Sequence, residues 1–147
     1  RIGKIVGAGK EQGNMLIKRF LSNLPSLKRL REQVETAGRR GRILAIDGRY
    51  LKVRSAHSAL NTLLQGAGAI ICKHWLLHII KRVYNKKLDV KLVASVHDEY
   101  QFEVANKDVG EFCSITKIAI KETEKTLKLR CPLDNDYKVG VTWTETH

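Results

Sequence analysis

Apolar residues recur every three or four positions in four stretches of the chain, which is the spacing of an amphipathic helix. These stretches are residues 9–22, 25–38, 55–87 and 107–127. Pro25 suits the first turn of the second helix, and Gly38 favours its end. Gly66 and Gly68 lie inside the third stretch, and we expect them to break that helix or to let another segment pack closely against it.

Five shorter segments have the composition of β-strands: residues 43–46, 50–53, 91–96, 100–104 and 137–143. Asp47-Gly48 separates the first two, and Asp-Gly between β-prone runs is the strongest short signal for a hairpin. A tight turn separates the next two, so a second hairpin is predicted there. The order of helices and hairpins predicts an α+β fold with an antiparallel sheet.

The length and composition favour a chain that builds its own core, with 147 residues of which 43% are apolar. We expect no apolar run long enough to cross a bilayer, and no signal peptide opens the sequence. The cysteines, Cys72, Cys113 and Cys131, are odd in number and lack a CxxC pair, which argues against a disulfide framework or a zinc knuckle. We expect them to be small buried apolar residues in a reducing compartment.

The positive charge is large and uneven. Lys and Arg number 27 against 15 Asp and Glu, a net charge of +12. The balance is +8 in residues 1–50, +5 in residues 51–100 and −1 in residues 101–147. This asymmetry favours a surface that meets nucleic acid, although charge by itself also fits an anionic membrane or a soluble surface rich in lysine.

The turn between residues 96 and 100 carries the first candidate site. Asp98 and Glu99 would lie at the tip of a hydrophobic hairpin beside His97, where Asn-Gly or Asp-Gly would be more stable because those residues accept a positive φ. Two adjacent carboxylates repel each other, and a hard divalent cation such as Mg²⁺ would relieve the repulsion. Taken alone, the pattern has a simpler explanation as an acidic surface turn.

The second candidate site lies on the long helix. His57, Asn61 and Gln65 recur every four residues and therefore share one helix face, with Arg54 just before them. Amide side chains on such a face can donate to the minor-groove acceptors that every base pair presents. The alternative is a polar helix face toward solvent, and the spacing does not decide between them.

Taken together, these two groups resemble the polymerase I family, also called family A. The motif residues are Arg54, Ser55, His57, Asn61, Gln65, Gly66 and Ala69, followed about thirty residues later by Val96, His97, Asp98 and Glu99. Residues 1–10 are similar to the segment after the fingers helix of phage replicative polymerases, and residues 140–147 are similar to the family's carboxy terminus. Bacterial members usually have arginine at the position of His57, so the resemblance favours the phage-type branch.

The resemblance implies a polymerase palm portion in which antiparallel β-hairpins pack on long helices, plus two helices from the fingers. Residues 1–38 would be the carboxy-terminal part of the fingers, and residues 39–147 that of the palm. Asp98 would be one of two aspartates that hold the two catalytic Mg²⁺ ions expected in the intact enzyme. Glu99 would support it, and His97 would approach the primer terminus. The residues expected to contact duplex DNA are Arg54, His57, Asn61 and Gln65.

For the parent protein, the resemblance implies a DNA-directed DNA polymerase that uses primer–template DNA and deoxynucleoside triphosphates. The family's Asp-x-Ser-x-x-Glu-Leu-Arg motif and its nucleotide-binding fingers helix are absent, so we expect this chain alone to be inactive. Its start at Arg1, with Met15 as the only methionine, suggests a piece of a longer protein. We expect a cytoplasmic location (in a bacterial host if the gene belongs to a phage), no membrane partner, and any processivity factor to bind outside this segment.

A different class of function is a free-standing nucleic-acid-binding module with a polymerase-like shape and no chemistry. The net charge of +12 and the missing first carboxylate motif support this alternative. Tight duplex binding by the isolated chain, with a steep salt dependence, would favour the module.

Overall fold

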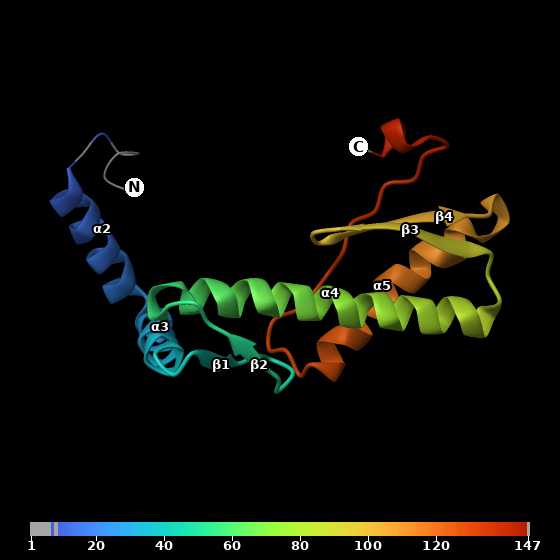
Figure 1. Ribbon diagram of the computed structural model, residues 1–147. Helices are drawn as coiled ribbons and strands as arrows, with labels where there is room; N and C mark the ends of the chain where they lie inside the picture. Colours follow the sequence, from blue (N-terminus) through green and yellow to red (C-terminus); the bar gives the residue numbers. More distant parts are fainter. Residues whose placement is uncertain (1–6, 8, 147) are drawn as a thin grey trace. The chain divides into compact units, whose positions relative to one another are not determined.

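Long helices and two short hairpins make up the computed structural model, which describes residue 7 and residues 9–146 (Figure 1). The helices are α2 (Lys10–Asn23), α3 (Pro25–Gly38), α4 (Ala59–Lys86) and α5 (Val109–Thr126). The strands are β1 (Arg42–Leu44), β2 (Tyr50–Lys52), β3 (Val90–Val96) and β4 (Glu99–Val104). The 3₁₀ turns are η1 (Ala56–Ser58), η2 (Asn106–Asp108) and η3 (Trp143–Glu145). This content confirms the predicted α+β class, with the strands in two separate two-stranded sheets instead of one.

The chain divides into two compact units, Arg1–Leu64 and Gln65–His147, and each contains a cluster of buried apolar residues. This division concerns compactness alone. The assignment of residues 1–38 to the fingers and residues 39–147 to the palm stays a prediction.

In the first unit, the end of α3 meets the hairpin β1–β2 and the start of α4. The residues buried together there are Val34, Ile43, Val53 and Ala59. Pro25 is the first residue of α3, as its sequence predicts. Gly38 ends this helix at a place without room for a side chain, because a Cβ there would lie 2.7 Å from the Cβ of Ala59. The glycine is therefore required by close packing.

The Asp47-Gly48 turn joins β1 to β2, which pair antiparallel with Leu44 opposite Tyr50. Gly48 has a φ of +86°, a conformation that glycine adopts without strain. Asp47 accepts hydrogen bonds from the backbone N–H of Arg49 at 3.3 Å and from its guanidinium Nε at 2.6 Å. Desolvation acts to raise the pKa of Asp47, but these bonds outweigh it and the pKa is lowered. The role of Asp47 in the turn therefore explains why a carboxylate is found at this position.

In the second unit, α4 and α5 pack together, and the hairpin β3–β4 lies against them (Figure 1). The buried residues at the centre are Ile79, Phe112, Ile115 and Ala119. The residues packed around them are Trp75, Val83, Leu88, Val90, Phe102 and Val104. Thr123 is also fully buried, and its hydroxyl donates to the carbonyl of Ala119 at 2.9 Å, so this polar group is satisfied. The helical stripe predicted for α5 thus forms one side of this core.

Helix α4 runs unbroken through Gly66 and Gly68, so the expected interruption is wrong. A Cβ on Gly68 would meet nothing within 4 Å, so close packing does not explain this glycine either. A glycine costs a helix interior about 1 kcal/mol, and the surrounding leucine, isoleucine and alanine residues carry the helix through. The helix begins at Ala59 after the turn η1, later than the predicted start at Ser55.

The segment Ala56–Lys86 is long and apolar enough to cross a membrane by length and composition alone. The mean hydropathy of its qualifying window is 1.3, and 11% of that window is buried. This corrects the expectation that no apolar run is long enough, because an average over the window tolerates the polar residues that interrupt the run. A single helix of this kind is weak evidence for a membrane span.

Residues 137–143 do not form the predicted last strand. Val141 is 97% exposed, and the nearby sheet consists of β3 and β4 alone. β-prone residues form a strand only where a neighbouring strand and a packed face are available. The segment ends in η3, where Thr142 and Glu145 form a capping box.

The expectation of buried cysteines holds only in part. Cys72 and Cys113 are partly buried, whereas Cys131 is exposed. Cys131 follows the end of α5 and therefore lies outside the packed stripe of that helix.

Candidate functional site

His97 and Asp98 form the two-residue turn of the hairpin β3–β4, because Val96 pairs with Glu99. His97 has a φ of +54°, a conformation that histidine adopts more often than most residues. Glu99 is the first residue of β4, so the predicted loop of residues 97–99 is one residue too long. The side chains of His97, Asp98 and Glu99 are exposed. The hairpin thus brings all three predicted residues to one tip.

Glu99 is held by a neighbour on its own strand. Its Oε1 accepts a hydrogen bond from Nε2 of Gln101 at 2.9 Å. Residues two apart in a strand share one face, so Tyr100 between them faces the other way. That other face lies toward α4.

Trp75 of α4 lies against the face of the hairpin that carries Tyr100; the sequence analysis did not name it, and it treated Cys72, three residues earlier, only as a buried apolar residue. The ring centroids of Trp75 and Tyr100 are 5.7 Å apart. Burial raises the pKa of the Cys72 thiol, and the nearby carboxylate of Asp98 raises it further. Burial and the neighbouring Cys72 also raise the pKa of Tyr100, against a hydrogen bond with Ser95 that lowers it. The spacing of three residues, which puts both side chains on one helix face, was the signal available in the sequence.

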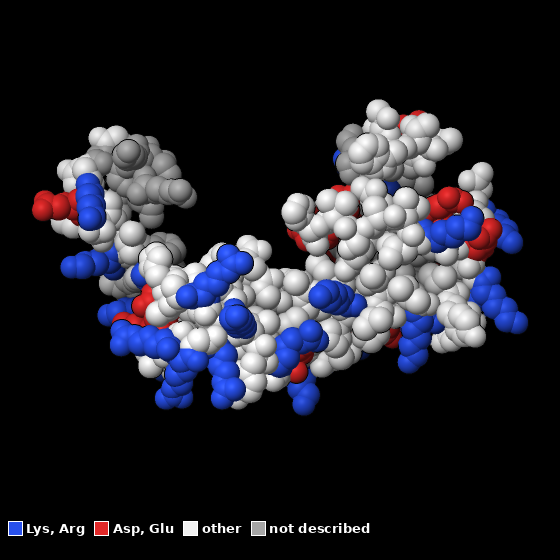
Figure 2. Space-filling model, viewed as in Figure 1, with Lys and Arg blue, Asp and Glu red and all other residues white. Residues whose placement is uncertain are grey.

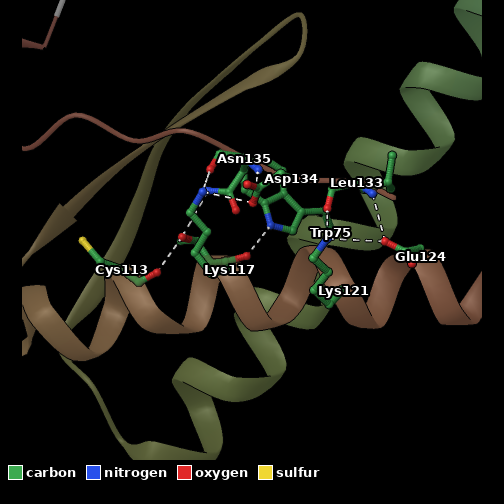
Figure 3. Close-up of polar contacts among 9 residues, drawn as sticks. Trp75, Cys113, Lys117, Lys121, Glu124, Leu133, Asp134 and Asn135 are labelled. Atoms are coloured by element: carbon green, nitrogen blue, oxygen red, sulfur yellow. Dashed lines mark hydrogen bonds and ion pairs between the residues drawn. The ribbon is translucent and has the colours of Figure 1, made fainter. Parts of the chain in front are cut away.

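Trp75 is the first in a row of aromatic rings, and it also forms a hydrogen bond from α4 to α5. Ring centroids are 6.5 Å apart for Tyr100 and Phe102, and 4.9 Å apart for Phe102 and Phe112. The indole N–H of Trp75 donates to the carbonyl oxygen of Thr116 in α5 at 3.0 Å (Figure 3). The hairpin is therefore fastened to both helices.

Residues 133–135 lie along α5 and are bound by its side chains (Figure 3). Nζ of Lys117 is 3.0 Å from Oδ1 of Asp134 and also donates to the carbonyl of Asn135. Glu124 accepts a hydrogen bond at 2.9 Å from the N–H of the first residue in the segment. Lys117, followed by the N–H of Asn135, lowers the pKa of Asp134. These bonds hold the segment after α5 in place.

The predicted duplex-contacting residues are exposed, but they do not form one helical stripe. Asn61 and Gln65 lie four residues apart on one face of α4. His57 lies in the 3₁₀ turn η1, whose tighter winding breaks the four-residue spacing, and Arg54 precedes that turn. Of the four predicted residues, Asn61 and Gln65 are therefore the two that share one face of α4.

Across the part of the chain that the structure describes, no group of three or more His, Cys, Asp and Glu side chains could hold a metal ion. A basic groove of about 440 Å³ does lie between α4 and α5. Its carboxylate, Glu122, is already bound by Arg82 at 3.0 Å and lies 3.4 Å from Nδ1 of His78. The role of Asp98 as a metal ligand stays a prediction, and the structure shows its side chain exposed at the tip of the hairpin.

The fold matches part of a polymerase domain. The structure of the POL domain of Pol1 from M. smegmatis, in complex with DNA primer-template and dNTP, matches with a TM-score of 0.74. The match covers 82% of this chain and 24% of that chain. The two sequences are 18% identical, so this likeness concerns the fold alone.

The family model of DNA polymerase family A matches residues 11–145, and the chain belongs to this family. It is 37% identical to the DNA-directed DNA polymerases of Enterobacteria phage T3 and Escherichia phage T7, over 100% of this chain and 24% of each relative. It is 30% identical to DNA polymerase I of Geobacillus stearothermophilus, over 86% of this chain and 14% of the relative. The family resemblance is confirmed, and the higher identity to the phage enzymes agrees with the phage-type branch.

Proposed function

We propose that this chain is the carboxy-terminal part of the fingers and palm of a DNA-directed DNA polymerase, and that the whole enzyme carries out template-directed DNA synthesis. Family membership over residues 11–145 supports this proposal. The chain spans about a quarter of the length of its phage relatives, so the remaining parts of the enzyme would lie outside it. In this proposal, residues 1–38 belong to the fingers and residues 39–147 to the palm.

The position of Asp98 carries the proposal. It is an exposed carboxylate at a two-residue turn, and two residues later the ring of Tyr100 contacts Trp75 of α4. A carboxylate that holds Mg²⁺ must be both accessible and fixed. The described residues contain no complete metal site, so Asp98 would share its ion with carboxylates from elsewhere in the polymerase. When bound, two Mg²⁺ ions supply charge neutralisation for phosphoryl transfer.

The neighbours of Asp98 have supporting roles in the proposal. His97, whose backbone conformation fixes the start of the turn, would contact the primer terminus. Glu99 would add negative charge beside Asp98 without itself being a required ligand, and Gln101 orients its side chain. Both side chains are exposed, so a bound primer end would have access to them.

Duplex DNA is the proposed partner of the helix face with Asn61 and Gln65. Their exposed amides can donate to minor-groove acceptors that are present in every base pair, so they would sense duplex geometry instead of sequence. Arg54 and His57, also exposed, would add contacts to the backbone. Lys and Arg side chains cover more of the face drawn in Figure 2 than Asp and Glu do, in line with the net charge of +12.

Exposed apolar residues on the hairpin β3–β4 support a larger parent protein. Leu92, Val93 and Val96 are 43%, 64% and 47% exposed. A two-stranded hairpin is marginally stable by itself, and apolar residues of this size on its surface are suited to packing against another part of the enzyme. With the first carboxylate motif missing as well, the isolated chain would be inactive.

The observations that favour a non-catalytic nucleic-acid-binding module are the charge of +12 and the lack of a metal-binding group among the described residues. The family match gives the polymerase proposal the stronger support. A cytoplasmic location and a processivity factor bound elsewhere on the enzyme remain part of the polymerase proposal.

The test is primer extension by the full-length protein that contains this segment. We expect Asp98→Asn to abolish extension while duplex binding persists, because the amide cannot replace an anionic metal ligand. Asp89→Asn, at the opposite end of the same hairpin, is the matched control and should keep both properties. Substantial synthesis by Asp98→Asn would remove the proposed role of Asp98. Tight, salt-sensitive duplex binding without any extension by the unaltered protein would favour the binding module.

A further inference from the structure

The turn that carries Asp98 needs support from outside its own hairpin. The sheet has two strands, and such a hairpin is marginal alone. Its register shifts between Leu92 and Ala94, which interrupts the regular ladder of hydrogen bonds. His97 also has a positive φ, which persists in a non-glycine residue only where the surroundings fix it.

Trp75 contacts the hairpin through Tyr100, and it contacts α5 through a hydrogen bond of its indole N–H. Its ring lies 5.7 Å from that of Tyr100, two residues after Asp98, at an interplanar angle of 53°. Its indole N–H donates at 3.0 Å to the carbonyl of Thr116, a residue that is 6% exposed. One side chain of α4 thus fixes the start of β4 to a buried point on α5.

Cys72 shows that the same helix face reaches the turn itself. It precedes Trp75 by three residues on α4 and so shares its face. The carboxylate of Asp98 is close enough to add to the burial that raises the pKa of the Cys72 thiol. Asp98 lies in the two-residue turn just before β4, and Tyr100 is the second residue of that strand, so a shift of Tyr100 away from Trp75 would displace the turn as well.

We propose that Trp75 is a positioning residue for Asp98, acting through Tyr100. The proposal rests on the proposed function, because it concerns the carboxylate assigned to metal binding there. Trp75 itself touches no reacting group. Its ring sets the distance between the hairpin and α4, and its N–H sets the orientation of that ring against α5.

The variants Trp75→Phe and Trp75→Leu separate these two contributions in the full-length polymerase. Phenylalanine keeps a ring beside Tyr100 and loses the bond to Thr116, whereas leucine loses both. We expect backbone amide exchange at residues 96–100 to accelerate in the order wild type, Trp75→Phe, Trp75→Leu. The Mg²⁺ concentration for half-maximal primer extension should rise in the same order, by about 10-fold for leucine, the scale known for residues that orient metal ligands.

The matched control is Leu77→Ala, on the same helix at a side chain that is 63% exposed, and it should leave both readouts unchanged. Exchange in the hairpin β1–β2, which belongs to the first compact unit, serves as an internal reference. If Trp75→Leu does not fold, Tyr100→Leu removes the same ring contact from the other side and should reproduce its effect.

The outcomes distinguish this inference from the proposed function. Primer extension by Asp98→Asn would refute the proposed function whatever Trp75 does. With Asp98→Asn inactive, wild-type exchange and Mg²⁺ dependence in both Trp75 variants would overturn the positioning role alone. Equal acceleration of exchange in both hairpins would also overturn it, because that result indicates general destabilisation.

Discussion

Arg82 of α4 and Glu122 of α5 form an ion pair with two hydrogen bonds. Nε of Arg82 lies 3.0 Å from Oε2 of Glu122, and Nη2 donates to Oε1. The hydrogen bonds from Arg82 are the largest cause of the lowered pKa of Glu122. The two side chains are 31% and 35% exposed, so the pair joins the helices at the edge of the second core and remains partly screened by solvent.

We expect Glu122→Gln to lower the free energy of unfolding at pH 7 by about 0.5–1 kcal/mol. The folded-state pKa lies below the ordinary value of 4.5, so this stabilisation is complete above that value and is lost as the pH falls through the folded-state pKa. Urea unfolding of both proteins from pH 7 down to pH 3 measures it. Glu32→Gln, an exposed change on α3, is the control. A difference that stays constant down to pH 3 would contradict the assignment.

Two glycine-to-alanine changes should have opposite signs. Gly38→Ala places a Cβ 2.7 Å from the Cβ of Ala59 and 3.3 Å from the Cα of Ala56, and we expect it to destabilise the chain by about 1–3 kcal/mol. Gly68→Ala meets nothing within 4 Å inside α4 and should stabilise by about 0.5–1 kcal/mol. Thermal unfolding monitored by circular dichroism gives both values. Stabilisation by Gly38→Ala would show that this contact relaxes.

Lys117→Met should release the segment that follows α5. The change removes the ion pair with Asp134 and the bond to the carbonyl of Asn135. Loss of about 1 kcal/mol of local stability corresponds to roughly fivefold faster amide exchange in residues 133–135. Lys125→Met, an exposed change on the same helix, should not affect that segment. Equal exchange rates in the two variants would count against the role of Lys117.

Gln65→Ala should impair extension of the primer in the full-length polymerase by about three- to tenfold, the effect of losing one hydrogen bond to the duplex. Nucleotide affinity should change little, because Gln65 is expected to contact DNA that is already formed. Single-turnover extension from matched and mismatched primer ends measures this effect. Asn85→Ala removes an exposed amide at the far end of the same helix and should have no effect. An unchanged extension rate in Gln65→Ala would remove the groove contact.

Local signals in the sequence predicted most of the elements correctly. The period of apolar residues located α2, α3 and α5 to within a few residues, and Asp47-Gly48 located the first hairpin. These signals work because helix and hairpin geometry depend on neighbouring residues. The motif from Arg54 to Glu99 identified the family because a motif depends on the order of residues along the chain and not on their contacts in the fold.

Local signals gave wrong predictions where the structure of a segment depends on contacts with residues far away in the sequence. The β-prone residues 137–143 stay unpaired, because no strand lies beside them in the part of the second unit that the structure describes. Gly66 and Gly68 do not interrupt α4, since the rest of the helix tolerates their cost. A propensity therefore gives the preference of a segment but not the contacts that finally determine its structure.

The sequence by itself determined the helices, the two hairpins, the family and the identity of Asp98 as the central candidate residue. Only the tertiary structure decided that Trp75 lies against Tyr100 and that the carbonyl of Thr116 binds the indole N–H of Trp75. The reason is physical: these features arise from contacts between α4, β4 and α5, whose residues lie tens of positions apart in the chain. Sequence spacing specifies which residues share a face, and packing specifies what that face meets.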